Sequence, residues 1–265
     1  MIPHVLSVAG NDPTACSGIG ADLKTFAALG AYGMAVITAL TVQNTQGVRA
    51  ISPVAPECVG AQLDAVLEDV RVDALKLGML TDTGIICAVA TRLASRPILP
   101  AVLDPVMLAS SGDALMTGHA LAALRDVLLP RITVLTPNLH EAATLLDIPP
   151  AGNLEQMHQQ AVMLQGLGPS WVLLKGGHLG GECSPDVLAG PSGVQTFDAP
   201  RLACSNSRGT GCTLSSAIAA LLPRHSVHES VAMAKRFVKA ALSTSDTLDV
   251  GEGPGPLNHF CSNLT

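Results

Sequence analysis

Short apolar runs alternate with helical stretches along most of the chain. The apolar runs have the length of strands and contain few charged residues. This alternation is typical of a parallel sheet whose two faces are both covered by helices. The sequence predicts strands at 4–9, 35–41, 74–77, 101–104, 133–136 and 171–175, and helices at 21–29, 56–70, 84–94, 118–128, 140–146 and 154–167.

The pattern changes after residue 185. Two short apolar runs, 186–189 and 194–197, flank a Gly-Pro-Ser-Gly turn, which predicts an antiparallel hairpin. The chain then returns to helix at 213–222 and 227–244. Neither an internal repeat nor a long linker is visible, so we expect residues 1–265 to form a single domain.

The composition argues against several classes of protein. Apolar residues make up 48% of the 265 positions and charged residues 14%, which is too apolar for a disordered chain. The apolar stretches are interrupted before they reach membrane-spanning length. A net charge of −6 without a basic cluster argues against nucleic acid as a partner. Since no secretion signal is visible and the seven cysteines form no Cys-x-x-Cys pair, we expect a cytoplasmic protein.

Glycine and polar residues gather where the predicted parallel strands end. They occupy 10–13, 43–45, 78–79, 104–107, 137–141 and 175–178. The carboxyl ends of parallel strands lie at one edge of a sheet, and ligands of open α/β sheets bind outside that edge. The sequence therefore predicts a single edge that binds a polar ligand.

The most informative stretch is Gly209-Thr210-Gly211-Cys212-Thr213, which opens a strongly apolar predicted helix. A glycine-rich turn at a helix start leaves backbone N–H groups unpaired. The helix dipole adds partial positive charge, so the turn can bind an anion such as phosphate. In this field Cys212 is expected to have a lowered thiol pKa and to act as a base or nucleophile. The alternative is an ordinary cap in front of a core helix.

Three more residues fit a site for phosphoryl transfer. The sequence contains neither a P-loop nor a dinucleotide-binding fingerprint. Lys175 could hold charge on a transferred group, while Asp104 and Glu141 could position Mg²⁺ partly through water. Alternatively, Lys175 is only solvated and Asp104 forms a turn before Pro105. Together with the glycine turn, the residues favour phosphoryl transfer.

Motifs that resemble a known family are spread over nearly the whole chain. They lie at 21–25, 29–33, 43–45, 76–79, 136–138, 175–178 and 209–213. On these motifs the chain resembles the hydroxymethylpyrimidine kinase/phosphomethylpyrimidine kinase family of thiamine biosynthesis, within the ribokinase-like superfamily. Cys212 is the most specific match, because most kinases of the superfamily carry an aspartate at this position.

The resemblance implies a fold, an activity and ligands. The fold would be a three-layer α/β/α sandwich with a mostly parallel central sheet. ATP and Mg²⁺ would serve as cofactors for the phosphorylation of 4-amino-5-hydroxymethyl-2-methylpyrimidine and then of its monophosphate to the diphosphate. The partners would be this small-molecule pyrimidine and ATP, without nucleic acid or membrane, and a homodimer is a possible assembly.

The resemblance also implies roles for residues at matching positions. Gln43 would read the pyrimidine ring through its amide, which can both donate and accept hydrogen bonds. The other residues expected to line this pocket are Asp22, Gly10, Met79 and Val106. The turn 209–212 would form the anion hole beside Lys175. Cys212 would lie near the hydroxymethyl oxygen as a base or as an orienting group.

The chain departs from the family pattern close to this site. The first loop usually carries glycines where this chain has Ala15 and Cys16. A positive φ at either position would cost about 1–2 kcal/mol or force a different loop path. Arg208 replaces the usual histidine and brings a permanent charge beside the anion hole.

Two other functions stay open. One is a vitamin B6 kinase, because the same superfamily phosphorylates the hydroxymethyl group of pyridoxine-type rings. The other is a pyrimidine-binding protein without catalysis, with Ala15, Cys16 and Arg208 as marks of lost activity. The intact phosphate-handling residues, Lys175 and Cys212 among them, argue against this second alternative.

Overall fold

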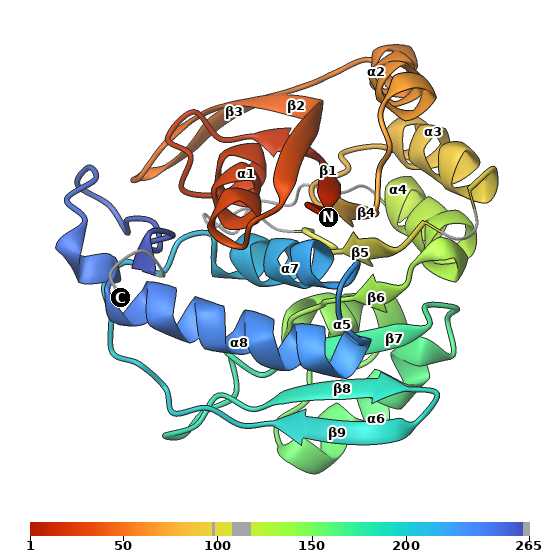
Figure 1. The fold of residues 1–265 in the computed structure, drawn as a ribbon. Helices are drawn as coiled ribbons and strands as arrows, with labels where there is room; N and C mark the ends of the chain where they lie inside the picture. The colour runs from red at the N-terminus through yellow and green to blue at the C-terminus, as the bar shows by residue number, and fades with distance from the viewer. Residues whose placement is uncertain (97–98, 108–117, 262–265) are drawn as a thin grey trace.

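One nine-stranded sheet runs through the described part of the chain, in the order β3-β2-β1-β4-β5-β6-β7-β8-β9 (Figure 1). A computed structural model describes residues 1–96, 99–107 and 118–261. The strands are β1 (His4–Asn11), β2 (Tyr32–Asn44), β3 (Gly47–Pro53), β4 (Ala74–Leu77), β5 (Ala101–Leu103), β6 (Val134–Leu135), β7 (Trp171–Lys175), β8 (Asp186–Gly190) and β9 (Gly193–Phe197). Strands β2, β1, β4, β5, β6 and β7 are parallel, so their carboxyl ends share one edge as predicted.

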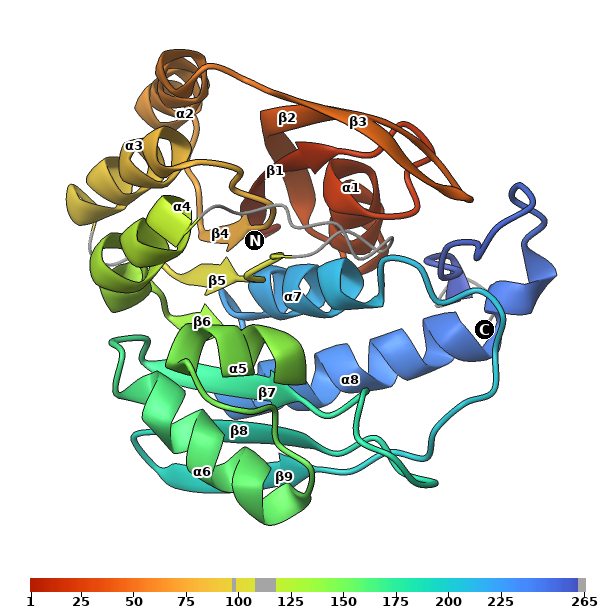
Figure 2. The same ribbon diagram turned by 180° about the vertical axis from the view of Figure 1, so that it is seen from behind.

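Helices cover both faces of this sheet. Figure 1 shows α1 (Gly18–Ala28), α7 (Thr210–Leu221) and α8 (Val227–Ser243) on one face. Figure 2 shows the other face, with α2 (Pro56–Asp69), α3 (Thr83–Ala94), α4 (Gly118–Ala123), α5 (Leu139–Leu146) and α6 (Leu154–Gln165). Each helical layer has its own buried apolar core against the sheet, centred on residues such as Ile218 on one face and Leu103 on the other. The predicted three-layer sandwich is confirmed.

Helix α5 shows how the local sequence positions a site residue. The Asn138 side chain accepts hydrogen bonds from the backbone N–H groups of His140 and Glu141, both at 2.9 Å. The Glu141 carboxylate in turn accepts a 2.7 Å hydrogen bond from the Asn138 N–H. This reciprocal capping starts the helix directly after β6 and fixes the Glu141 side chain at the carboxyl edge of the sheet.

Two predicted elements differ from the structure. Strand β2 extends through Asn44, and an antiparallel partner, β3, follows it after a short turn, so 43–45 is not a loop beyond the strand. The sequence signal for β3 is weak because this edge strand is largely exposed and has no buried apolar run. The predicted helix 118–128 is α-helical only to Ala123 and continues as the π-helical segment Leu124–Leu128.

The hairpin predicted after residue 185 is confirmed as β8 and β9, both antiparallel to their neighbours. Short 3₁₀ turns at Leu129–Arg131 and Ser245–Thr247 complete the secondary structure of the described residues. None of the helices among these residues has both the length and the apolar character that crossing a membrane requires.

Candidate active site

Two cavities open at the carboxyl edge of the sheet and meet at the glycine-rich turn. Their volumes are about 770 Å³ and about 220 Å³. The residues that border both are Asn138, Lys175, Arg208, Gly209 and Gly211. A group bound in one cavity could therefore reach a group bound in the other across this turn.

The smaller cavity holds most of the residues predicted to bind the substrate. Gly10, Gln43, Met79 and Val106 line it, together with Cys212. Sequence reasoning missed part of the wall, because Val48 and Ile51 come from the unpredicted strand β3. The cavity thus combines apolar side chains such as Val48 and Ile51 with polar and charged ones, which suits a small ring that carries hydrogen-bonding groups.

Asp22 does not line this cavity, contrary to the prediction. It is completely buried, and its carboxylate accepts hydrogen bonds from Ser7 (2.6 Å), Lys76 (2.8 Å) and Ser216 (2.7 Å). Burial alone would lower the pKa of Lys76, but Asp22 and other acidic groups raise it above the ordinary value. Asp22 thus pairs with Lys76, which does border the cavity, and ties β1 and β4 to α7.

Lys76 is a site residue that the sequence analysis did not single out. It is the one charged residue in the short strand β4, where its side chain is entirely buried. A lysine in such a strand must have a partner, because an unpaired buried charge is strongly unfavourable. That requirement is the signal that could have identified it.

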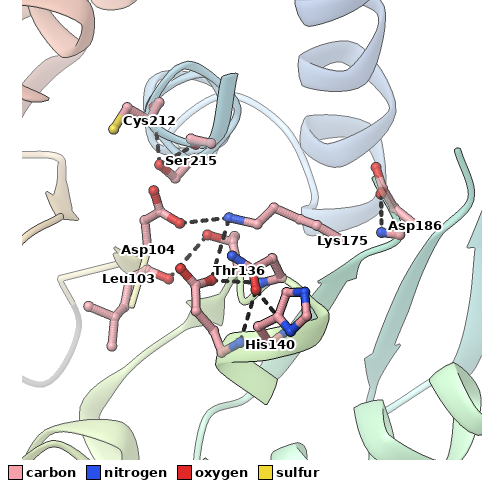
Figure 3. Close-up of polar contacts among 12 residues, drawn as sticks. Leu103, Asp104, Thr136, His140, Lys175, Asp186, Cys212 and Ser215 are labelled. Atoms are coloured by element: carbon pink, nitrogen blue, oxygen red, sulfur yellow. Dashed lines mark hydrogen bonds and ion pairs between the residues drawn. The ribbon is translucent and has the colours of Figure 1, made fainter. Parts of the chain in front are cut away.

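The predicted phosphoryl-transfer residues come together where the two cavities meet: Lys175 borders both cavities, whereas Asp104 and Glu141 border the smaller one. Figure 3 shows Lys175 extending toward Asp104, and its Nζ lies 2.8 Å from Asp104 Oδ1 and 4.0 Å from Glu141 Oε2. Burial disfavours the charged amine, but the two carboxylates raise the pKa of Lys175 to about 12. Lys175 is therefore a cation at neutral pH and is not merely solvated.

The pKa of the Glu141 carboxyl is also raised, and here burial is the main cause. Burial raises its pKa; Lys175 counteracts this rise, whereas the neighbouring Asp104 adds to it. The pair of carboxylates thus carries more negative charge than Lys175 alone compensates. A cation brought by a ligand would stabilise Glu141 in its ionised form.

The glycines of the turn are required by close backbone approach. Gly209 precedes α7 with a φ of +83°, and a Cβ on it would collide with the Cys16 carbonyl oxygen. The Thr210 hydroxyl donates a 2.6 Å hydrogen bond to the Ser207 carbonyl, and this bond stabilises the turn. Gly209 and Gly211 border both cavities, so the N-terminus of α7 lies at their junction, as an anion site requires.

The thiol of Cys212 does not have the lowered pKa expected from the helix start. Desolvation raises its pKa to about 11, and although Lys76 opposes the rise, the carboxylate of Asp104 adds to it. Burial and the nearby carboxylates thus outweigh the positive charge of Lys76. Cys212 is therefore a neutral thiol at pH 7, which favours an orienting role over that of a base.

The first loop contains the strain that its sequence suggested. Ala15 has a φ of +53°, in the left-handed region that glycine adopts without cost. Cys16 does not share this conformation, and its side chain is buried. Asp12 holds the loop in place, because its carboxylate accepts side-chain hydrogen bonds from Thr14 (2.7 Å) and Ser17 (2.8 Å).

The Asp12 carboxylate also contacts Gln43. Burial raises the pKa of Asp12, but hydrogen bonds from Thr14, Gln43 and Ser17 lower it by more, so the pKa lies below its ordinary value. Since a carboxylate can only accept, the Gln43 side chain must present its NH₂ group to Asp12. This contact orients the amide at the rim of the smaller cavity.

The larger cavity is lined by several basic side chains. Arg201, Lys235, Lys239 and His178 border it in addition to Lys175. Lys235 is held 2.7 Å from Asp186, and burial together with nearby positive charge lowers the pKa of His178. Such a lining suits a ligand with several phosphate groups.

Comparisons with known proteins agree with this arrangement. A family model described as phosphomethylpyrimidine kinase matches residues 12–258. The hydroxymethylpyrimidine/phosphomethylpyrimidine kinase of Escherichia coli strain K12 is 52% identical over 258 residues, which cover 97% of each chain. An ADP complex of Bacillus subtilis pyridoxal kinase has a TM-score of 0.92 at 30% identity and covers 100% of both chains. A phosphomethylpyrimidine kinase from Clostridium difficile 630 has a TM-score of 0.79 at 36% identity, covering 90% of this chain and 98% of its own.

Proposed function

Because the chain belongs to the phosphomethylpyrimidine kinase family, we propose that it phosphorylates 4-amino-5-hydroxymethyl-2-methylpyrimidine with ATP and then converts the monophosphate to the diphosphate. The observation that carries this proposal is the meeting of the two cavities at the turn 209–212. The pyrimidine occupies the smaller cavity, and ATP occupies the larger, basic one. The phosphoryl group crosses at the turn, where both cavities share Lys175 and Gly211.

In the first step the hydroxymethyl oxygen forms a bond to the γ-phosphorus of ATP while the bond to the departing ADP oxygen breaks. The N–H groups at the start of α7 and the ammonium of Lys175 stabilise the negative charge of the transferred group. Cys212 orients the hydroxymethyl group as a neutral thiol. A loose transition state requires little removal of the hydroxyl proton, so a strong base is not needed there.

Asp104 and Glu141 are the residues that would hold Mg²⁺. Among the described residues no group of three or more His, Cys, Asp or Glu side chains could hold a metal ion. Mg²⁺ fits such a sparse site, because it usually takes one or two carboxylates and completes its shell with phosphates and water. Bound there, it would neutralise charge on the phosphate oxygens. Burial and the neighbouring Asp104 raise the pKa of Glu141 although Lys175 is close, so a metal ion would supply positive charge that Lys175 alone does not provide.

Gln43 gives the smaller cavity its preference for a pyrimidine. The ring edge alternates an exocyclic amine with a ring nitrogen, and an amide oriented by Asp12 can meet both. Pyridoxal offers a phenolic hydroxyl and a single ring nitrogen, so one hydrogen bond would be lost. Pyridoxal is nevertheless the second candidate substrate, since a pyridoxal kinase superposes on the full chain with a TM-score of 0.92.

The test is to follow the products by phosphorus NMR after adding ATP, Mg²⁺ and the hydroxymethylpyrimidine to the purified protein. We expect the monophosphate to appear first and the diphosphate to follow. A Lys175→Met variant should lose at least about tenfold in kcat for both steps. The absence of any phosphorylated pyrimidine from the wild-type reaction would refute the proposal.

A further inference from the structure

Arg208 is a buried cation without an anionic partner in the described part of the chain. Its exposed fraction is 9%, and it lies immediately before the turn that joins the two cavities. Its Nη1 donates a 3.0 Å hydrogen bond to the carbonyl of Thr45 in the turn between β2 and β3. Its Nε is shielded from solvent and has no hydrogen-bond partner among the described residues.

The other basic residues of low exposure around the cavities are neutralised. Lys76 is paired with Asp22, Lys175 with Asp104, and Lys235 with Asp186, each at 2.7 to 2.8 Å. Buried charges in proteins are generally paired, and an unpaired one is costly. A backbone carbonyl compensates only part of the charge of a guanidinium. Arg208 therefore has the environment of a group that receives its counter-ion from a ligand.

The position of Arg208 identifies the chemistry of that ligand. A guanidinium binds phosphate oxygens with fixed geometry, and Arg208 borders both cavities at their junction. In the first reaction this junction holds one phosphate, the one being transferred. In the second it must hold two, because the acceptor is itself a phosphate. Lys175 is shared between Asp104, Glu141 and the transferred group, so a further cation at the junction would stabilise the second phosphate.

We infer that Arg208 binds the phosphate of the pyrimidine monophosphate and thereby favours the second phosphorylation over the first. The inference rests on the proposed function, and it gives the substitution of the usual histidine a specific role. The contact with Thr45 holds the guanidinium in place, so that it is ordered before the substrate binds. ATP also brings phosphate to the junction, and the experiment separates the two sources.

The test compares three variants in both reactions. Arg208→Gln removes the charge but keeps a donor for the Thr45 carbonyl, and Arg208→Lys keeps the charge. Arg224→Gln is the matched control, because Arg224 lies outside the cavities and also donates to a backbone carbonyl, that of Leu29 at 2.8 Å. KM for the pyrimidine, KM for its monophosphate, KM for ATP, and the urea midpoint are measured for each protein.

We expect Arg208→Gln to raise KM for the monophosphate at least tenfold while KM for the unphosphorylated pyrimidine changes less than twofold. Arg208→Lys should keep KM for the monophosphate close to the wild-type value, and Arg224→Gln should behave as wild type in both reactions. Isothermal titration with the monophosphate, without ATP, should show the same loss of affinity.

Other outcomes would overturn the inference. Equal changes in both reactions, or a fall of the urea midpoint without a change in KM, would reduce Arg208 to a structural residue. A rise in KM for ATP alone would assign it to the donor phosphate. A wild type that completes both steps, with Arg208→Gln unchanged, would overturn only this inference. A wild type that phosphorylates neither pyrimidine would overturn the proposed function as well.

Discussion

The ammonium of Lys175 and the carboxylate of Asp104 lie 2.8 Å apart directly against Gly211, the central glycine of the turn. A Cβ on Gly211 would lie 3.3 Å from Lys175 Nζ and 3.4 Å from Asp104 Oδ2. The ion pair and the start of α7 are thus packed so closely that no side chain fits between them without displacement. This contact joins Lys175, Asp104 and the start of α7, the groups proposed to handle the phosphate and Mg²⁺, into one unit.

Gly211→Ala tests this close packing. We expect kcat to fall at least about tenfold, because the added methyl group displaces the Lys175 ammonium from the transferred phosphate. Stability should be unchanged or higher, since alanine favours a helix by about 1 kcal/mol over glycine. Steady-state kinetics and thermal unfolding measure the two effects. Gly180→Ala is the control, because a Cβ at Gly180 meets no atom within 4 Å. An unchanged kcat would show that the unit tolerates displacement.

Cys212 is partly exposed as a residue, but desolvation of its thiol should make it titrate above the ordinary cysteine range. Since burial raises its pKa to about 11, the thiolate fraction at pH 7 to 8 is small, and alkylation by iodoacetamide should be slow and should accelerate only above pH 9. Mass spectrometry of the peptide that contains Cys212 gives the rate at each pH, with the exposed Cys58 as the internal comparison. A plateau in the rate near pH 7 would restore the interpretation of Cys212 as a reactive base.

Replacing Cys212 by alanine should affect turnover more than binding. The proposed role of the thiol is to orient the hydroxymethyl group during transfer. This role predicts that kcat falls at least about tenfold, a loss of about 1.4 kcal/mol in the transition state. Pyrimidine affinity, measured by titration without ATP, should stay nearly the same. An unaltered kcat would show that Cys212 has only a structural role in the first turn of α7.

Ala15→Gly should stabilise the protein. Its φ of +53° costs alanine about 1–2 kcal/mol relative to glycine, of which part is lost again to the greater freedom of the unfolded chain. We expect a net gain of about 0.5–1 kcal/mol in the free energy of unfolding, measured with urea. The same substitution at the exposed helical residue Ala65 should instead cost about 1 kcal/mol. A loss of stability at Ala15 would show that the strain is relieved elsewhere in the loop.

His259 should make the protein less stable in mild acid. Burial lowers its pKa to about 4, and its Nε2 lies 2.9 Å from the Thr213 hydroxyl at the start of α7. Below pH 6.5 the unfolded state takes up a proton that the folded state does not, so stability is lost as pH falls from about 6.5 toward 4. The corresponding loss is about 2 to 3 kcal/mol at pH 4. Urea unfolding of wild type and His259→Gln from pH 7 to 4 measures this contribution. If the free energy of unfolding fell equally with pH in both proteins, the prediction would be wrong.

The sequence predicted the parts of the site that depend on local pattern. The turn 209–213, the strand-end residues Lys175 and Asp104, and the capped helix start at Glu141 all lie where elementary rules for strands and helices place them. Parallel strands bring their carboxyl ends together whatever the residues between them. This is why residues far apart in the chain could be assigned to one edge.

The features that the sequence did not reveal depend on tertiary burial. Strand β3 is recognisable only through its pairing with β2, since its own residues are mostly exposed. Asp22 looks like a pocket residue until Lys76, 54 positions away, is found to be its partner. The raised pKa of the Cys212 thiol follows from desolvation and from the carboxylates of Asp104 and Asp22, which lie far from it in the sequence. Each of these requires knowledge of long-range packing.

The proposed role of Gln43 is to select the ring that the smaller cavity accepts. When the bound ring covers the Gln43 amide, leaving one of its polar groups without a hydrogen-bond partner costs about 1–3 kcal/mol. This cost corresponds to roughly five- to 150-fold discrimination between the pyrimidine and pyridoxal. Gln43→Leu should erase most of this preference by weakening the pyrimidine reaction. The ratio of kcat/KM values for the two substrates, compared between wild type and variant, measures the effect, and an unchanged ratio would place the selectivity elsewhere.

The most direct test of the whole account is a competition in one reaction. Equal concentrations of 4-amino-5-hydroxymethyl-2-methylpyrimidine and pyridoxal are mixed with wild-type protein, Mg²⁺ and limiting ATP, and the phosphorylated products are separated and quantified. The account predicts that phosphorylated pyrimidine exceeds pyridoxal phosphate at least about fivefold, the lower bound of the hydrogen-bond argument. Equal or greater formation of pyridoxal phosphate would contradict it.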